Sequence, residues 1–313
     1  MSERLPPLTA LRAFEVAARH MSFALAANEL HVTPAALSYQ IKSLEDHLGA
    51  PVFRRLNRAV ELTEVGKSLS LQVSEGFRQI EAGWSTARRL IDTNTLTVTA
   101  GPALTAKWLA PRLAEFARAH PEIDLRISAT LRQLDLHRDD VDVALRFGYG
   151  PDTGLYSLPA RREWLTPAMS PELAERFTTP ESLQEAPLIH DESISFLRPK
   201  CDWATWFRAV GLSFDNAHGA RFSNADHAVD AAVAGVGVVL GRRPMLIKDI
   251  QDGRLVAPFK TAIETKARFR FLCLTGAEAR PQVAAFRDWF ATEINRTAFF
   301  SDEFNVIPVE DLQ

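Results

Sequence analysis

The sequence is poor in cysteine and lacks a long apolar run. Its 313 residues include two cysteines, Cys201 and Cys273, which are far apart and match no metal-binding spacing. We expect two buried thiols, with a redox pair as the alternative. No apolar segment approaches the length of a membrane span, and residues 1–11 lack the apolar core and cleavage site of a signal peptide. These absences predict a cytoplasmic protein without a membrane partner.

Complete catalytic and cofactor motifs are also lacking. Gly235, Gly237 and Gly241 imitate a dinucleotide fingerprint, but the last glycine comes one residue late and a predicted helix precedes the first. The acidic residues at 139–142 lie just before a predicted buried strand, where a solvated loop is expected rather than a metal site. No serine lies in a G-x-S-x-G motif, and the histidines show no ligand spacing. The sequence therefore predicts no enzyme, no cofactor and no metal.

The segment from Ser22 to Gly49 predicts two helices joined by a very short turn. Ser22 can cap the first helix, and Thr33 followed by Pro34 is typical of the start of the second, where proline loses no hydrogen bond. The second helix has a predicted buried stripe at Leu37, Ile41, Leu44 and Leu48. Gly49 is expected to end this helix. Two helices connected so closely must cross, so the segment predicts a helix-turn-helix.

The opposite face of the second helix projects small, hydroxyl and cationic side chains, at Ala35, Ser38, Tyr39 and Lys42. A helix fits the width of the major groove of B-DNA, and side chains of these kinds can reach base edges and phosphates there. A plain packing corner between two helices is the alternative.

Residues 50–62 alternate arginine with apolar residues and predict a short two-stranded wing. Arg54, Arg55 and Arg58 lie in this segment, with the tip at Asn57 and Arg58. Arginines beside a recognition helix neutralise phosphates or enter a minor groove, whereas a solvated basic turn is the alternative. The whole chain has a net charge of −3, but residues 1–60 hold seven Lys and Arg against five Asp and Glu. The positive charge is thus clustered where a DNA contact is expected.

These motifs closely resemble the winged helix-turn-helix of LysR-type transcriptional regulators. The matching run is SFALAANELHVTPAALSYQIKSLEDHLGAPVFRRLNRAVELTEVG, and the first helix of the family resembles the preceding RLPPLTALRAFEVAARH. Within the family the chain is most similar to the branch of the glycine-cleavage activator and the beta-lactamase regulator. Over about the first 65 residues many individual residues match the family. Beyond them the resemblance is in the arrangement of helices and strands.

The resemblance implies base-reading residues at Pro34, Ala35, Ser38 and Tyr39, with Arg58 in the wing. Together with the residues derived above, the expected DNA-binding set is Thr33, Pro34, Ala35, Ser38, Tyr39, Lys42, Arg54, Arg55 and Arg58. Tyr39 stands where relatives often carry His or Arg, which leaves the base preference open, and Pro51 is unusual before the wing strand. The implied partners are double-stranded promoter DNA and a small-molecule effector, and RNA polymerase is a further candidate partner.

Residues 63–92 predict one long helix with an apolar seam. The seam positions are spaced by three or four residues, at Leu69, Val73, Phe77, Ile80, Trp84, Ala87 and Ile91. We expect this stripe to pair with the same helix of a second subunit, since in a solitary helix its apolar side chains would be exposed to solvent. Packing on the chain's own downstream domain is the alternative. The resemblance implies that the effector domains pair as well, which would give a homotetramer instead of a homodimer.

From residue 93 onwards the pattern alternates between strands and helices, which predicts a parallel α/β sheet with helices on both faces. The predicted strands are 96–100, 125–129, 141–147, 188–190, 221–223, 237–240, 255–256 and 269–274, and the predicted helices are 104–119, 203–210, 226–234 and 282–295. The second set of elements begins around residues 162–166. Two subdomains with two chain crossings resemble a periplasmic-binding-protein hinge. We expect lobe 1 at 93–162 and 267–300, and lobe 2 at 163–266.

Ligands of open α/β sheets bind beyond the carboxyl ends of the strands. The residues expected there are Gly101, Pro102, Ala103, Leu104, Thr130, Phe147, Gly148, Ser170, Ser223 and Asn224. Hydroxyls, amides and a helix start favour a carboxylated effector, although these side chains could instead cap their own helices. Arg146 and Arg221 are lower-ranked candidate cations.

The predicted organisation is therefore α/β with an N-terminal all-α winged helix-turn-helix at 5–62, a long dimerisation helix at 63–92 and a two-lobed effector domain at 93–313. The predicted function is a LysR-type transcriptional regulator controlled by a small molecule. A solute-binding protein of the periplasmic-binding fold and an α/β enzyme are the alternatives. The basic wing speaks against the first, and the missing nucleophile and cofactor motifs speak against the second.

Overall fold

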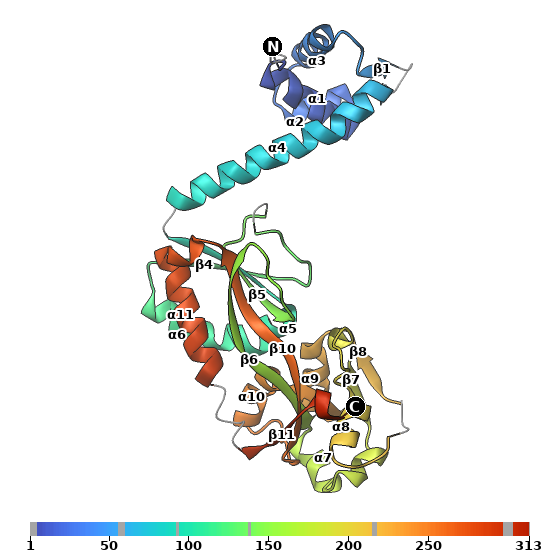
Figure 1. The fold of residues 1–313 in the computed structure, drawn as a ribbon, viewed down its shortest axis with the longest axis vertical. Helices are drawn as coiled ribbons and strands as arrows, with labels where there is room; N and C mark the ends of the chain where they lie inside the picture. The colour runs from blue at the N-terminus through green and yellow to red at the C-terminus, as the bar shows by residue number, and fades with distance from the viewer. Residues whose placement is uncertain are drawn as a thin grey trace. The chain divides into compact units, whose positions relative to one another are not determined.

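The computed structural model describes residues 5–55, 60–91, 94–136, 139–214, 218–296 and 303–312. The chain divides into two compact units, Met1–Arg89 and Leu90–Gln313 (Figure 1). No helix in the described part of the chain is long and apolar enough to cross a membrane.

The N-terminal unit contains the predicted helix-turn-helix. Its elements are α1 Leu8–His20, α2 Phe23–Glu29, α3 Pro34–Leu48, the strands β1 Phe53–Arg55 and β2 Val60–Leu62, and α4 Glu64–Ile91. The Ser22 hydroxyl accepts a hydrogen bond from the Leu25 N–H at 3.4 Å, and the Thr33 hydroxyl accepts one from the Ala36 N–H at 3.2 Å. Gly49 ends α3 in the left-handed region at φ 75°, where glycine carries no steric penalty. The predicted caps are therefore confirmed.

The core of this unit joins α1, α2 and α3 to the wing. The Phe53 ring of β1 packs against Phe14 at 5.5 Å and Phe23 at 5.2 Å between ring centroids. Of the predicted stripe of α3, the positions Leu37, Ile41 and Leu44 are buried. Leu48 was expected to be buried too, but it is 44% exposed, because it is the last residue of α3 and lies past the core.

The long helix α4 begins directly after the wing. Thr63 ties the two together, since its hydroxyl donates to the Pro51 carbonyl at 2.8 Å and accepts from the Gly66 N–H at 3.0 Å. A Cβ atom on Gly66 would lie 2.1 Å from the Val52 carbonyl oxygen, so only glycine permits this close approach. The orientation at the start of α4 is thus fixed by backbone contacts within its own unit.

The second unit is built on one mixed sheet. Its described strands are β3 Thr95–Ala100, β4 Asp124–Ala129, β5 Val143–Gly148, β6 Leu155–Ala168, β7 Leu188–Asp191, β8 Ala220–Phe222, β9 Val238–Arg242, β10 Thr261–Leu274 and β11 Asn305–Pro308. They pair in the order β4-β3-β5-β10-β6-β9-β7-β8, and β11 adds to β10. We call the part around β3, β4 and β5 the first lobe and the part around β7, β8 and β9 the second lobe.

In the sequence, the helices of this unit follow and precede its strands. The α-helices are α5 Pro102–Leu104, α6 Leu113–Ala119, α7 Pro171–Arg176, α8 Trp203–Ala209, α9 Ala225–Val233, α10 Arg243–Gln251 and α11 Pro281–Arg296. Between α5 and α6 the chain continues through a π-helical turn, Thr105–Leu109, and a 3-10 turn. Sequence reasoning placed a single helix over this stretch and missed α7 and α10.

Two long antiparallel strands, β6 and β10, connect the lobes (Figure 1). Within each lobe the remaining strands are parallel, as predicted. The prediction of a parallel sheet throughout was wrong, because the chain crosses between the lobes once in each direction and the two crossing strands must then run oppositely. The strand expected at Leu255 and Val256 is also absent from these described residues, where only an isolated bridge joins Val256 to Met169.

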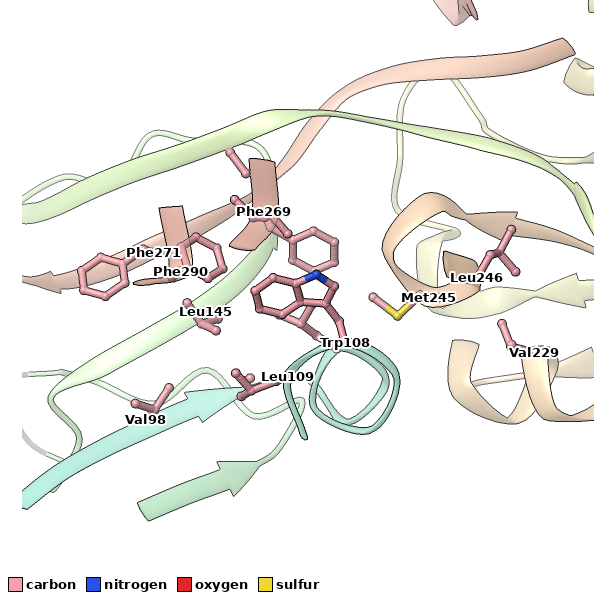
Figure 2. Close-up of a cluster of buried hydrophobic side chains, with 14 of the residues drawn as sticks. Val98, Trp108, Leu109, Leu145, Val229, Met245, Leu246, Phe269, Phe271 and Phe290 are labelled. Atoms are coloured by element: carbon pink, nitrogen blue, oxygen red, sulfur yellow. The ribbon is translucent and has the colours of Figure 1, made fainter. Parts of the chain in front are cut away.

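One apolar cluster extends from the first lobe into the second. Figure 2 shows Trp108, which is fully buried, beside Phe290 and Leu145 of the first lobe and facing Met245 of α10. The neighbouring Lys107 joins the same lobes by charge, since its Nζ lies 2.6 Å from Asp230 and 3.2 Å from Asp249. The helical segment after β3 is therefore packed against both lobes.

The two cysteines lie in this unit. Cys201 and Cys273 are both buried and free, which confirms the expectation of two buried thiols. Burial raises the pKa of each thiol to about 12. A thiol with such a pKa is almost entirely protonated at neutral pH and reacts poorly.

A buried ion pair lies where β6 passes between the lobes. Glu163 of β6 is fully buried and accepts a hydrogen bond from Arg243, at the start of α10, at 3.1 Å. Burial raises the pKa of Glu163 to about 7, although the charge of Arg243 acts in the opposite direction. The second carboxylate oxygen of Glu163 has no hydrogen-bond partner among the described residues.

This glutamate should make the stability of the protein depend on pH. Its folded-state pKa of about 7 lies above the ordinary value of about 4.3, so between these values the folded state holds more protons than the unfolded state. We therefore expect the free energy of unfolding to fall as pH rises through this window and to level off above it. Denaturant unfolding of Glu163→Gln should lack this decline, whereas the exposed control Glu175→Gln should keep it. An identical pH dependence in wild type and Glu163→Gln would contradict the assignment.

Candidate DNA interface and ligand cavity

The outward face of α3 carries the side chains that sequence reasoning assigned to DNA. Ala35, Tyr39 and Lys42 are exposed, and Tyr39 retains 71% of its surface. Ser38 lies on the same face and is half-buried. A surface tyrosine with this exposure is free to contact another molecule, whereas Leu37 and Ile41 between these positions are buried.

Thr33 and Pro34 occupy the N-terminus of this helix and are both exposed. Thr33 uses its hydroxyl as the helix cap, and Pro34 occupies the first turn. These two residues therefore determine where α3 begins, which in turn sets the direction of the exposed face.

A glutamate of α3 holds the wing. The Glu45 carboxylate accepts hydrogen bonds from the backbone N–H groups of Val52 at 2.9 Å and Phe53 at 3.4 Å. The first donor lies just before β1 and the second is its first residue. Glu45 thus holds the wing against α3, and sequence reasoning missed this role.

The predicted arginines of the wing differ in their surroundings. Arg54 lies opposite Glu61 in the β1–β2 register and its guanidinium is 3.7 Å from that carboxylate. Both groups are exposed, so this pair is screened by water and contributes little to stability. Arg55 lies opposite Val60 in β1. The predicted wing tip at Asn57 and Arg58 lies outside the described residues.

An apolar groove of about 720 Å³ runs along α4 in the same unit. We call it the α4 groove; it is lined by Leu5, Leu8, Leu11, Leu44, Leu48, Val73, Phe77 and Ile80, among others. Beyond this groove the seam of α4 is more exposed, with Trp84 at 69% and Ile91 at 83%. The predicted seam therefore packs on its own unit near Leu69 and Val73 and becomes accessible towards its end.

A cavity of about 220 Å³ lies at the carboxyl ends of the strands of both lobes. We call it the strand-end cavity. First-lobe residues at its wall include Gly101 after β3, Thr130 after β4 and Arg146 in β5. Second-lobe residues include Ser193 after β7, Asn224 after β8 and Arg242 at the end of β9. This is the location at which open α/β sheets bind ligands.

Arg146 brings a positive charge without a negative partner to this cavity. Its guanidinium donates hydrogen bonds to the Thr99 hydroxyl at 3.1 Å and to the carbonyl oxygens of Arg132 and Leu145 at 3.3 Å. All three acceptors are neutral, and among the described residues no carboxylate lies within ion-pair distance. Burial lowers the pKa of Arg146.

Arg242 lies on the opposite wall and is held more tightly. Its guanidinium lies 4.9 Å from the ring centroid of Phe147, 3.1 Å from the Ser193 hydroxyl and 3.5 Å from the Asp191 carboxylate. The side chain is 6% exposed, and its Nε lacks a hydrogen-bond partner in the described part of the chain. Arg242 therefore contacts both lobes and has its charge balanced by Asp191.

Seven of the ten residues expected at the strand ends line the strand-end cavity, namely Gly101, Pro102, Ala103, Leu104, Thr130, Phe147 and Asn224. Asn224 occupies the N-cap position of α9 but makes no capping hydrogen bond with its side chain, so that side chain remains available. Thr130 lines the cavity, and its hydroxyl accepts a hydrogen bond from the Arg132 N–H at 3.1 Å.

The other three expected residues do not line this cavity. Ser170 is buried and accepts a hydrogen bond from the Leu173 N–H as the cap of α7. Ser223 is exposed, and Gly148 adjoins Arg270 and Phe196. Sequence reasoning also missed several wall residues, among them Gln133, Ser193 and Arg242.

The helix-turn-helix with its wing and the two-lobed unit with its ligand cavity together define a ligand-responsive transcriptional regulator. Residues 8–67 match the family described as bacterial regulatory helix-turn-helix protein, lysR family, and residues 92–295 match the LysR substrate binding domain. The chain belongs to the LysR family of DNA-binding transcriptional regulators. This assignment decides against the solute-binding protein and the α/β enzyme.

Full-length relatives support the same conclusion. The chain is 43% identical to the glycine cleavage system transcriptional activator of Escherichia coli strain K12, over 92% of this chain and 94% of the relative. It is 35% identical to the HTH-type transcriptional activator AmpR of Pseudomonas aeruginosa, over 90% and 94%. The solved effector domain of that AmpR covers 66% of this chain, with 98% of its own length aligned, a TM-score of 0.55 and 29% identity.

The contact of Glu45 with the wing leads to a specific prediction. In Glu45→Ala two backbone N–H groups lose their acceptor, which should cost about 1–3 kcal/mol of stability in the N-terminal unit and weaken DNA binding. Glu45→Gln keeps a carbonyl oxygen and should be milder. Thermal unfolding and DNA titration measure both effects, with Asp46→Ala, the exposed neighbour, as the matched control. Equal behaviour of Glu45→Ala and Asp46→Ala would argue against this role.

Proposed function

We propose that this regulator reads promoter DNA with the exposed face of α3 and is controlled by a small carboxylated effector in the strand-end cavity. The observation that carries the effector proposal is the uncompensated charge of Arg146 at the ends of the strands. A carboxylate bound there would supply the negative partner that the described residues do not provide. A cytoplasmic location fits a protein that must reach DNA.

The DNA proposal rests on the chemistry of the α3 face. Ala35, Ser38 and Tyr39 offer small, hydroxyl and aromatic groups for base edges, and Lys42 offers a charge for a phosphate. Thr33 and Pro34 set the start of this face. Arg54, Arg55 and Arg58 of the wing are assigned to the phosphate backbone or a minor groove.

The effector would act by stabilising one arrangement of the two lobes relative to another. The strand-end cavity takes residues from both lobes, so a ligand that touches both binds one arrangement more tightly than another. Only this difference in affinity can be passed on to the DNA-binding units. The connection through Trp108 and Lys107 provides packed and charged contacts that a shift of the lobes would change.

We further propose that the working unit is at least a homodimer formed through α4. The α4 groove and the exposed side chains of Ile80, Trp84 and Ile91 leave apolar surface in water along one helix. A second copy of α4 would cover this surface and place two recognition helices on one DNA. Pairing of the effector units as well would produce a homotetramer.

The reading role of α3 is tested with Tyr39→Ala. A base contact of this residue should contribute about 1–3 kcal/mol of discrimination, so the variant should lose preference for the operator over unrelated DNA. Lys42→Ala should instead weaken binding to both sequences and lower the dependence on salt. Fluorescence anisotropy with the two duplexes at several salt concentrations separates these outcomes. If Tyr39→Ala changed neither affinity nor preference, the proposed face would be incorrect.

The role of α4 in assembly is tested with Trp84→Glu. A charge placed in a desolvated seam is unfavourable, so the variant should sediment as a smaller species than wild type. Leu71→Glu is the matched control, since Leu71 is 72% exposed and lies off the seam of the same helix. In analytical ultracentrifugation, Leu71→Glu should assemble like wild type, whereas Trp84→Glu should not. Unchanged assembly of Trp84→Glu would refute pairing through this seam.

A further inference from the structure

We infer that the effector is a small organic acid with one negative charge and no ammonium group, a hydroxy or keto acid rather than an amino acid. This inference rests on the proposed function of the strand-end cavity and adds the charge and size of the ligand. It follows from the net charge of the cavity wall, the kinds of polar groups on it, and the volume it encloses.

The charge of the wall calls for one anionic group. Arg146 and Arg242 are the charged residues among the described residues that line the cavity. Arg242 is balanced by the Asp191 carboxylate at 3.5 Å, which is 5% exposed and is not among the residues that line this cavity. Within the described part of the chain, Arg146 donates to neutral oxygen atoms alone. One positive charge therefore remains, and a ligand with one carboxylate neutralises it.

The same wall is unsuited to an ammonium group. None of the described residues lining the cavity is Asp or Glu. A ligand ammonium would lose its hydration and would lie near two guanidinium groups without an acidic partner, which is strongly unfavourable. An amino acid carries such a group at neutral pH, whereas a hydroxy or keto acid of the same carbon skeleton does not.

The remaining polar side chains suit neutral oxygen atoms. Gln133 and Asn224 each provide an amide that can donate or accept, and the hydroxyls of Thr130 and Ser193 can do the same. These side chains come from both lobes, so a second polar oxygen on the ligand can be bound opposite to the carboxylate. This arrangement favours a hydroxyl or keto oxygen on the acid.

The volume limits the size of the ligand. The cavity encloses about 220 Å³, which corresponds to roughly seven water molecules at about 30 Å³ each. Sites for drug-sized ligands start at about 300 Å³. The acid should therefore have on the order of ten non-hydrogen atoms or fewer.

Isothermal titration calorimetry on the full chain tests this with matched pairs of acids. Lactate and alanine differ in the replacement of a hydroxyl by an ammonium group, and so do glycolate and glycine; pyruvate adds the keto acid. We expect at least one of lactate, glycolate and pyruvate to bind, at least about tenfold more tightly than its amino-acid counterpart. Tighter or equal binding of alanine or glycine overturns the inference, and so does the absence of binding by all three acids at about 10 mM.

Variants separate this inference from the proposed site. Arg146→Gln should reduce the affinity of the bound acid at least about tenfold, whereas Arg126→Gln, an exposed arginine of β4 paired with Asp124, should not. Ala103→Phe adds a ring at the cavity wall and should block every ligand of this site. If alanine or glycine binds wild type but not Ala103→Phe, the site stands and the acid class is wrong. If a bound acid is indifferent to both Ala103→Phe and Arg146→Gln, the site itself is wrong.

Discussion

The two crossing strands β6 and β10 are the constraint on which the effector unit depends. Each is 14 residues long and belongs to the sheet of both lobes. Because they hold the lobes in one sheet, the carboxyl ends of β3, β4 and β5 face those of β7, β8 and β9 across one cavity. Glu163 and Arg243 are buried at this crossing. The burial of these two charges has a cost in desolvation.

A second constraint shapes the N-terminal unit. Glu45 and Thr63 both satisfy backbone groups around the wing, one from α3 and one from the start of α4. Hydrogen bonds therefore connect α3 to the wing and the wing to the first turn of α4.

Local signals in the sequence were sufficient for much of this structure. The caps at Ser22 and Thr33, the stripe at Leu37, Ile41 and Leu44, and the ends of β3 and β4 each depend on neighbouring residues, and the structure agrees with them. The strand-end rule likewise led to seven residues of the cavity wall, because parallel strands within one lobe end at the same edge.

The failures came from interactions between distant segments. Arg242 was overlooked because β9 was expected to end at Leu240, and its partner Asp191 lies 51 residues away. The direction of β6 relative to β10 depends on how the chain crosses between lobes, which local periodicity does not encode. Ser170 was assigned to the cavity from its place after a strand, but its hydroxyl caps α7. A short hydroxyl side chain fits both roles in sequence, and only the fold decides between them.

The central claim is that occupation of the strand-end cavity alters how the same chain binds DNA. The most direct measurement is the operator affinity and footprint of the full chain as an organic acid is titrated, in wild type and in Arg146→Gln. The account predicts that the acid changes the affinity or the protected region in wild type, and that Arg146→Gln requires at least about tenfold more acid for the same change. An identical response of both proteins, or no response of wild type to an acid that binds it, would contradict the account.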